Sequence, residues 1–101
     1  MGRAKIDIPK DHIAEFCRRH NIRKLALFGS VLRDDFDLDS DVDVLVEFEP
    51  DTRVGLIRLA GLELELGEIL GRTVDLNTPG FLSEYYRNEI LAEAEVQYHA
   101  A

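Results

Sequence analysis

Asp41 and Asp43 stand one residue apart, and ten residues separate them from the pair Gly29-Ser30. Aspartate carboxylates are ligands that Mg²⁺ accepts alongside the phosphates of a substrate. A glycine and a serine at the start of a helical turn present backbone N–H groups and a hydroxyl to an anion, and the glycine lets the backbone approach it closely. This spacing therefore predicts a site for a nucleotide bound as its magnesium complex.

A calcium loop is the first alternative for the acidic stretch, which holds six aspartates in residues 34–43. An EF-hand requires glycine at position 6 of its loop and a bidentate glutamate at position 12. A loop starting at Asp35 has Ser40 and Val46 at these positions, and a loop starting at Asp37 fails in both as well. The spacing does not support an EF-hand.

A solvated charged loop is the second alternative. It suffices for the first four aspartates of the stretch, Asp34, Asp35, Asp37 and Asp39. It does not suffice for Asp41 and Asp43, because strict alternation over residues 41–48 predicts a half-buried strand with both carboxylates on one face. Aspartate is a poor strand former, and like charges on one face weaken folding. Such a violation of local preference favours a functional site.

The remaining elements follow from hydrophobic periodicity and from glycine and proline positions. We predict helices over residues 9–20, 56–70 and 81–96, strands over 22–28, 41–48 and 73–77, and a short helix over 30–33 that Ser30 would cap. Residues 34–40 form a loop and residues 78–80 a turn. This order predicts an α/β (α+β) fold, a small mixed sheet with helices packed on one face.

Composition limits the function. A chain of 101 residues fits one domain over residues 1–101. The net charge of −8 disfavours direct binding to nucleic acid, whereas nine acids and no Lys or Arg between Asp34 and Asp51 suit a metal ion or a basic protein partner. The single cysteine, Cys17, excludes an intrachain disulfide. Without a signal peptide or a long apolar segment, we expect a cytoplasmic protein with no membrane partner.

The motif Gly29-Ser30, ten residues, Asp41-Val42-Asp43 resembles the signature of the nucleotidyltransferase superfamily that includes DNA polymerase beta. That signature adds a third carboxylate on a later strand, and Asp75 in RTVDLNTP takes its place. More narrowly, LFGSVLRDDF, SDVDVLVEF and the VDL strand are similar to minimal nucleotidyltransferases that act as antitoxins beside HEPN-domain ribonuclease toxins. Many of those proteins read GSxARG; this chain keeps the arginine, as Arg33, and differs at the neighbouring alanine and glycine.

The resemblance implies a polymerase beta-like fold and a Mg²⁺-dependent transfer of AMP from ATP to a hydroxyl. The acceptor would be a tyrosine of a HEPN toxin, held in a hetero-oligomeric complex with this chain. The rival hypothesis is an antitoxin that masks its toxin by contact, without turnover. A small-molecule transferase is disfavoured, because the chain has no room for a second domain that would hold the small molecule.

The resemblance also assigns roles to residues. Asp41, Asp43 and Asp75 would hold one or two Mg²⁺ ions (Mn²⁺ would also fit), and Asp75 would help to activate the acceptor. The triphosphate would contact Gly29, Ser30, Arg33 and Ser40. Arg33 could equally pair with one of the loop acids Asp34, Asp35 or Asp37. We expect the tyrosines of the last predicted helix, Tyr85, Tyr86 and Tyr98, to serve the core and a partner surface.

Overall fold

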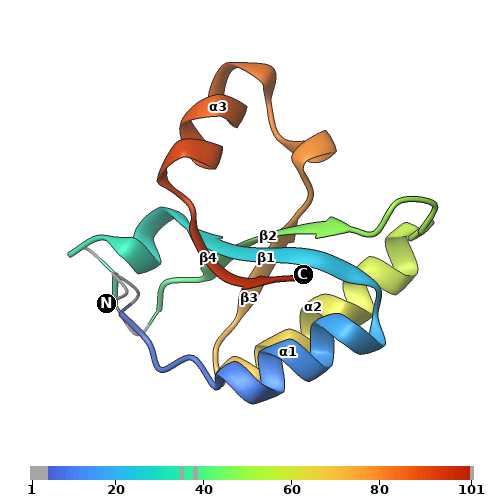
Figure 1. Ribbon diagram of the computed structural model, residues 1–101. Coiled ribbons are helices and arrows are strands. Elements are labelled where there is room, and N and C mark those ends of the chain that lie inside the picture. Colours follow the sequence, from blue (N-terminus) through green and yellow to red (C-terminus); the bar gives the residue numbers. More distant parts are fainter. Residues whose placement is uncertain (1–4, 35, 38, 101) are drawn as a thin grey trace.

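The computed structural model describes residues 5–34, 36–37 and 39–100 and contains a mixed four-stranded sheet (Figure 1). The strands are β1 (Ile22–Phe28), β2 (Val42–Phe48), β3 (Val74–Asn77) and β4 (Glu95–His99), in the order β3-β2-β1-β4. β1 runs antiparallel to both β2 and β4, and β2 runs parallel to β3. The predicted mixed sheet is confirmed.

Helices α1 (Lys10–Arg19) and α2 (Leu56–Leu70) cover one face of this sheet, whereas α3 (Glu84–Glu93) stands on an arm on the other side (Figure 1). Short 3₁₀ helices span Gly29–Leu32, directly after β1, and Pro79–Phe81, at the base of the arm. Within the described residues, no helix has both the length and the apolar character needed to cross a bilayer.

The core lies between the sheet and the two covering helices. Val42, Val44 and Val46 of β2 are fully buried there, against a layer that includes Phe16 of α1 and Leu66 of α2. Each such side chain stabilises the fold by roughly 1.5–3 kcal/mol. Because side chains alternate along a strand, the residues between these valines point to the opposite face of the sheet.

The last predicted helix, over residues 81–96, is wrong at both ends. α3 begins only at Glu84 and ends at Glu93, after which Ala94 leaves the helical region with φ −59° and ψ 136°. The chain then forms β4, which adds to the free edge of β1 through pairs such as Ala26 with Val96. The alanines and glutamates of residues 92–95 favour helix, but backbone pairing with β1 overrides that local preference.

The three tyrosines therefore occupy different environments. Tyr98 lies on β4, not on a helix, and packs half-buried against the core. Tyr85 and Tyr86 lie on α3 and are exposed. Only Tyr98 contributes to the core, while the other two remain available to a partner.

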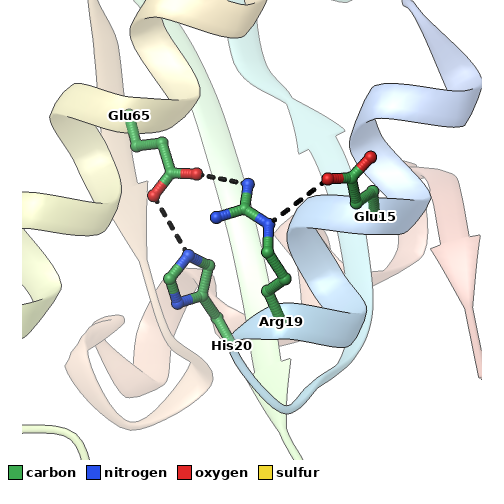
Figure 2. Close-up of polar contacts among 4 residues, drawn as sticks. All are labelled: Glu15, Arg19, His20 and Glu65. Carbon is green, nitrogen blue, oxygen red and sulfur yellow. Dashed lines mark hydrogen bonds and ion pairs between the residues drawn. The ribbon is translucent and has the colours of Figure 1, made fainter.

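A polar cluster joins α1 to α2 (Figure 2). The guanidinium of Arg19 lies 2.5 Å from Glu65 Oε2 and 3.7 Å from Glu15 Oε1, and His20 Nε2 lies 3.0 Å from Glu65 Oε1. The His20 ring also stands edge-on to Phe16, with 5.0 Å between ring centroids. Burial acts to raise the pKa of Glu65, but the hydrogen bonds and charges of Arg19 and His20 hold the pKa below its ordinary value of 4.5.

Glu65→Gln should therefore remove stability that depends on pH. A carboxyl with a lowered folded-state pKa stabilises the fold above its ordinary pKa, and this contribution is lost as pH falls through the folded value. We expect the variant to be less stable than the parent by up to about 1 kcal/mol at pH 7, because the cluster is partly exposed. The difference should shrink as pH falls below the ordinary pKa of 4.5 and vanish once pH is below the lowered folded-state pKa. Urea unfolding across this range measures it, with Glu89→Gln, exposed on α3, as control; a difference independent of pH would contradict the assignment.

Candidate active site

Asp43 is the central residue of the predicted site. In the register of the sheet it pairs with Phe28 of β1 on one side and with Asp75 of β3 on the other. Neighbouring strands lie about 4.8 Å apart, so Asp43 and Asp75 are adjacent on the face that points away from α1 and α2. Asp41 stands directly before β2 and, by alternation, on the same face. The three aspartates singled out in the sequence thus come together.

The charges of these carboxylates act on one another. Asp43 is half-buried, and its pKa is raised first by desolvation and then by the negative charges of Asp75 and Asp41. The positive charge of Arg33 acts in the opposite direction. Asp41 and Asp75 are exposed. The site therefore concentrates negative charge that a bound cation would relieve.

Asp43→Asn should stabilise the protein in the absence of metal. The change keeps the side-chain shape while removing a partly desolvated charge and its repulsion from Asp41 and Asp75. We expect a rise in Tm of a few degrees, since about 1 kcal/mol corresponds to roughly 4 °C or more in a chain of this size. Thermal melts in EDTA measure it, with the exposed loop residue Asp39→Asn as control. A fall in Tm for Asp43→Asn would mean that the carboxylate has a stabilising partner.

Gly29 forms the turn that lies against Asp43. It follows β1 with φ 76°, a left-handed conformation that glycine adopts readily and other residues rarely adopt. A Cβ on Gly29 would overlap Asp43 Oδ2 and would lie 3.2 Å from Asp43 Cγ. Ser30 lies inside the 3₁₀ helix, half-buried, and its carbonyl accepts the Arg33 N–H at 2.8 Å. The predicted cap by Ser30 is wrong, because the helix already begins at Gly29 and Phe28 is its N-cap. The predicted phosphate turn and the carboxylate pair are therefore in direct contact.

Arg33 pairs with a residue that the sequence did not indicate. Its Nη2 lies 3.2 Å from Glu93 Oε1 at the end of α3, instead of pairing with Asp34 or Asp37. Asp34 pairs with Lys5 at 3.2 Å, and Asp35 lies outside the described residues. The arm between β3 and β4 brings the end of α3 to this side of the sheet, which explains the unexpected partner.

Ser40 belongs to a tight turn held by an arginine that sequence reasoning missed. Its hydroxyl accepts the Asp37 N–H and donates to Asp37 Oδ1, both at 3.1 Å. Arg72 donates to the carbonyls of Asp37 and Ser40 at 2.6 and 3.0 Å and lies over the Phe36 ring, 4.5 Å from its centroid. Only its place just before the strand of Asp75 could have drawn attention to Arg72. A phosphate contact by Ser40 stays a prediction.

The donor set fits a hard divalent cation. Carboxylate oxygens are ligands that Mg²⁺ and Mn²⁺ prefer, and Mg²⁺ commonly takes only one or two of them together with phosphate oxygens. Over the described ranges, no three His, Cys, Asp or Glu side chains are already arranged to hold an ion by themselves. The adjacent pair Asp43 and Asp75 matches the case in which a nucleotide supplies the remaining ligands.

Two surface pockets lie in different parts of the molecule. A pocket of about 420 Å³ borders Asp41, with Ser40, Arg72 and Thr73 in its wall. A pocket of about 480 Å³ lies between α1 and α2, and its lining includes Glu15, Arg19 and Glu65 but none of the three aspartates. The second pocket lies on the helical layer, away from the carboxylates, and the first touches only Asp41 of the three. We therefore assign the chemistry to the sheet face that carries Asp43 and Asp75, and to neither pocket.

A family model and a related sequence both point to one family of proteins. The model of the nucleotidyltransferase domain family matches residues 10–96. The protein adenylyltransferase MntA of Thermococcus cleftensis is 35% identical over 82 residues, which cover 81% of each chain.

Two solved structures share the fold. A toxin-antitoxin structure with AMP-PNP superposes with a TM-score of 0.74 at 19% identity and covers 92% of this chain and 75% of that one. A tri-AMPylated HEPN toxin of Shewanella oneidensis in complex with its MNT antitoxin gives 0.66 at 19% identity, with 90% and 70% covered. At this identity they show a common fold.

Proposed function

The chain belongs to the nucleotidyltransferase domain family, and from this premise we propose that it transfers AMP from ATP to a hydroxyl of a HEPN-class toxin. Nucleotidyl transfer follows from the family. What we propose beyond it is ATP as the substrate, Mg²⁺ as the cofactor, the toxin as the partner and a tyrosine of that toxin as the acceptor. Two comparisons support it: the Thermococcus relative is named a protein adenylyltransferase, and the Shewanella structure contains an AMPylated HEPN toxin with its antitoxin.

The contact of Gly29 with Asp43, beside Asp75, is the observation that carries the proposal. A triphosphate held by the backbone of the Gly29-Ser30 turn would lie next to the carboxylates. Arg33 would then neutralise phosphate charge by exchanging Glu93 for a phosphate oxygen. A triphosphate held in this way would have its α-phosphate directed toward an acceptor that arrives at the open face of the sheet.

The reaction exchanges one bond to phosphorus for another. The acceptor oxygen would attack the α-phosphorus, the bond from that phosphorus to the bridging oxygen would break, and pyrophosphate would leave. Mg²⁺, when bound, supplies charge neutralisation and a lowered pKa of the attacking hydroxyl. Asp41 and Asp43 would hold it with the phosphates, and Asp75 would help to take up the proton of the acceptor.

The direct test uses the purified chain with its HEPN-class partner and ATP labelled at the α-phosphate. We expect the label on the toxin and a mass gain of one or more AMP units on a tyrosine, while ATP labelled at the γ-phosphate gives none. Asp39→Asn should retain the activity. Label transferred from the γ-phosphate, or from neither position, would overturn the proposal.

ATP should bind only with Mg²⁺ or Mn²⁺. Without a cation, the triphosphate meets the charges of Asp41, Asp43 and Asp75, and each like-charge pair at 4 Å costs about 4 kcal/mol at an effective dielectric constant near 20. Titration calorimetry in Mg²⁺ and in EDTA measures the effect. Equal affinity for ATP under both conditions would contradict the proposal that a metal ion binds at this site.

A further inference from the structure

The outer side of α2 carries an apolar stripe that no other described residue covers. Ile57 is 92% exposed and Leu64 is 72% exposed, and both lie on the side opposite the buried Leu66. Ala60 and Gly61, also exposed, stand between them at helical spacing. The α2 stripe (Ile57, Ala60, Gly61 and Leu64) makes this helix apolar on two opposite sides. This pattern is typical of helices that are buried on both sides.

The stripe is separate from the surfaces already described. The flank of α2 toward α1 is closed by the cluster of Glu65, Arg19 and His20 (Figure 2). The carboxylates lie on the far face of the sheet from α2. At Gly61, no heavy atom of the described residues beyond its own helix lies within 4 Å of the place where a Cβ would stand. The centre of the stripe can therefore admit a second helix at close range.

The stripe is complementary to itself. When two copies of α2 are placed antiparallel about a point between positions 60 and 61, Ile57 faces Leu64 of the other copy, and Ala60 faces Gly61. The same operation repeats both contacts in reverse, as a two-fold interface requires.

The charges beyond the stripe match in this arrangement. Glu68 follows it at the carboxyl end of α2, and Arg53 precedes the helix at the other end. Both side chains are exposed, and neither forms a salt bridge within the described residues. The N-cap Gly55 provides no side-chain cap, so the positive end of the helix dipole is open to an acid. In the antiparallel pair, Glu68 of each copy would approach Arg53 and this helix end of the other.

We infer that a second copy of this chain docks on the α2 stripe, with a two-fold axis between Ala60 and Gly61. Both carboxylate faces stay open in this dimer. One pair of 15-residue helices is small beside the roughly 800 Å² per partner of a standard interface, so we expect a dissociation constant of roughly 1–100 µM.

Sedimentation of the purified chain across this concentration range tests the dimer. Leu64→Lys should weaken it at least about a hundredfold, because the change occurs twice per dimer. The control is Leu91→Lys, since Leu91 is an exposed leucine on α3, outside α2; it should leave association unchanged. A monomeric parent, a dimeric Leu64→Lys variant or equal loss in the control would each overturn the inference.

Cross-linking tests the position of the axis. Gly61→Cys should form an intermolecular disulfide under mild oxidation, and Leu56→Cys should not. Cys17, the one native cysteine, does not interfere, because it is fully buried and its pKa is raised to about 12. Equal cross-linking at both positions, or none at Gly61→Cys, would place the axis elsewhere and overturn the inference.

A charge reversal tests the antiparallel orientation. Glu68→Arg and Arg53→Glu should each weaken the dimer through like-charge contacts, and an equimolar mixture of the two variants should associate again, because both contacts are then restored. A mixture that stays monomeric would contradict the orientation. If the parent is monomeric and Leu64→Lys instead loses a HEPN-class toxin, the stripe belongs to that partner and the inference fails.

Discussion

Asp75→Asn is expected to lower the rate of AMP transfer at least about a hundredfold while ATP binding changes little. Asp75 is exposed on the edge strand β3, and asparagine has nearly the same shape, so the sheet should persist. In the proposed mechanism Asp41 and Asp43 hold the nucleotide-bound metal, while Asp75 serves activation of the acceptor. Single-turnover transfer and calorimetry of ATP binding measure the two effects, with Asp39→Asn as a charge-matched control.

The same variant separates transfer from masking. If silencing of the toxin requires AMP transfer, Asp75→Asn should bind the toxin and leave it active. If the variant silences the toxin while mass spectrometry finds no added AMP, then contact alone suffices and the proposed enzymatic mechanism of neutralisation is wrong. Nucleotidyltransferase family membership would not change in that case.

Gly29→Ala is expected to abolish most transfer and to destabilise the fold. A methyl group at φ 76° would overlap Asp43 Oδ2, and the carboxylate or the turn would have to shift. A displacement of about 1 Å in reacting groups can cost about a hundredfold in rate, and the left-handed conformation itself costs roughly 1–2 kcal/mol in a residue with a Cβ. Transfer kinetics and urea unfolding report the two losses.

Gly71→Ala is the matched control for that change. Gly71 ends α2 at φ 68°, but within the described part of the chain no atom beyond its immediate neighbours lies within 4 Å of the place where its Cβ would stand. It should show the same conformational cost in stability without the collision, and hence far higher activity than Gly29→Ala. Similar activities in the two variants would mean that the approach of Gly29 to Asp43 has no part in transfer.

The elements that end at these glycines were predictable from the sequence. The predicted strand 22–28 and the predicted helix 56–70 coincide with β1 and α2, and each is followed by a glycine with positive φ, Gly29 and Gly71. Local chemistry decides such ends, because a residue without a Cβ is needed there. The common face of Asp41 and Asp43 was predictable for a similar reason, since strand alternation is a local property.

The features that the sequence did not indicate depend on residues far apart in the chain. β4 exists because Glu95–His99 finds the edge of β1, although its first residues favour helix. Arg33 meets Glu93, and Arg72 holds the turn at Asp37, only after the sheet has assembled. Spacing and propensity carry no information about these pairs, because tertiary contact creates them.

The pairing of β1 with β4 affects the order of events during synthesis. Lys24 pairs with His99, so β1 leaves the ribosome long before its partner on that side exists. Until then, β1 can pair with β2 while its other edge presents unpaired N–H and C=O groups, a template for wrong association. Contacts between residues so distant in the chain also form slowly. The sheet is therefore complete only once β4 has been synthesised and has paired with β1.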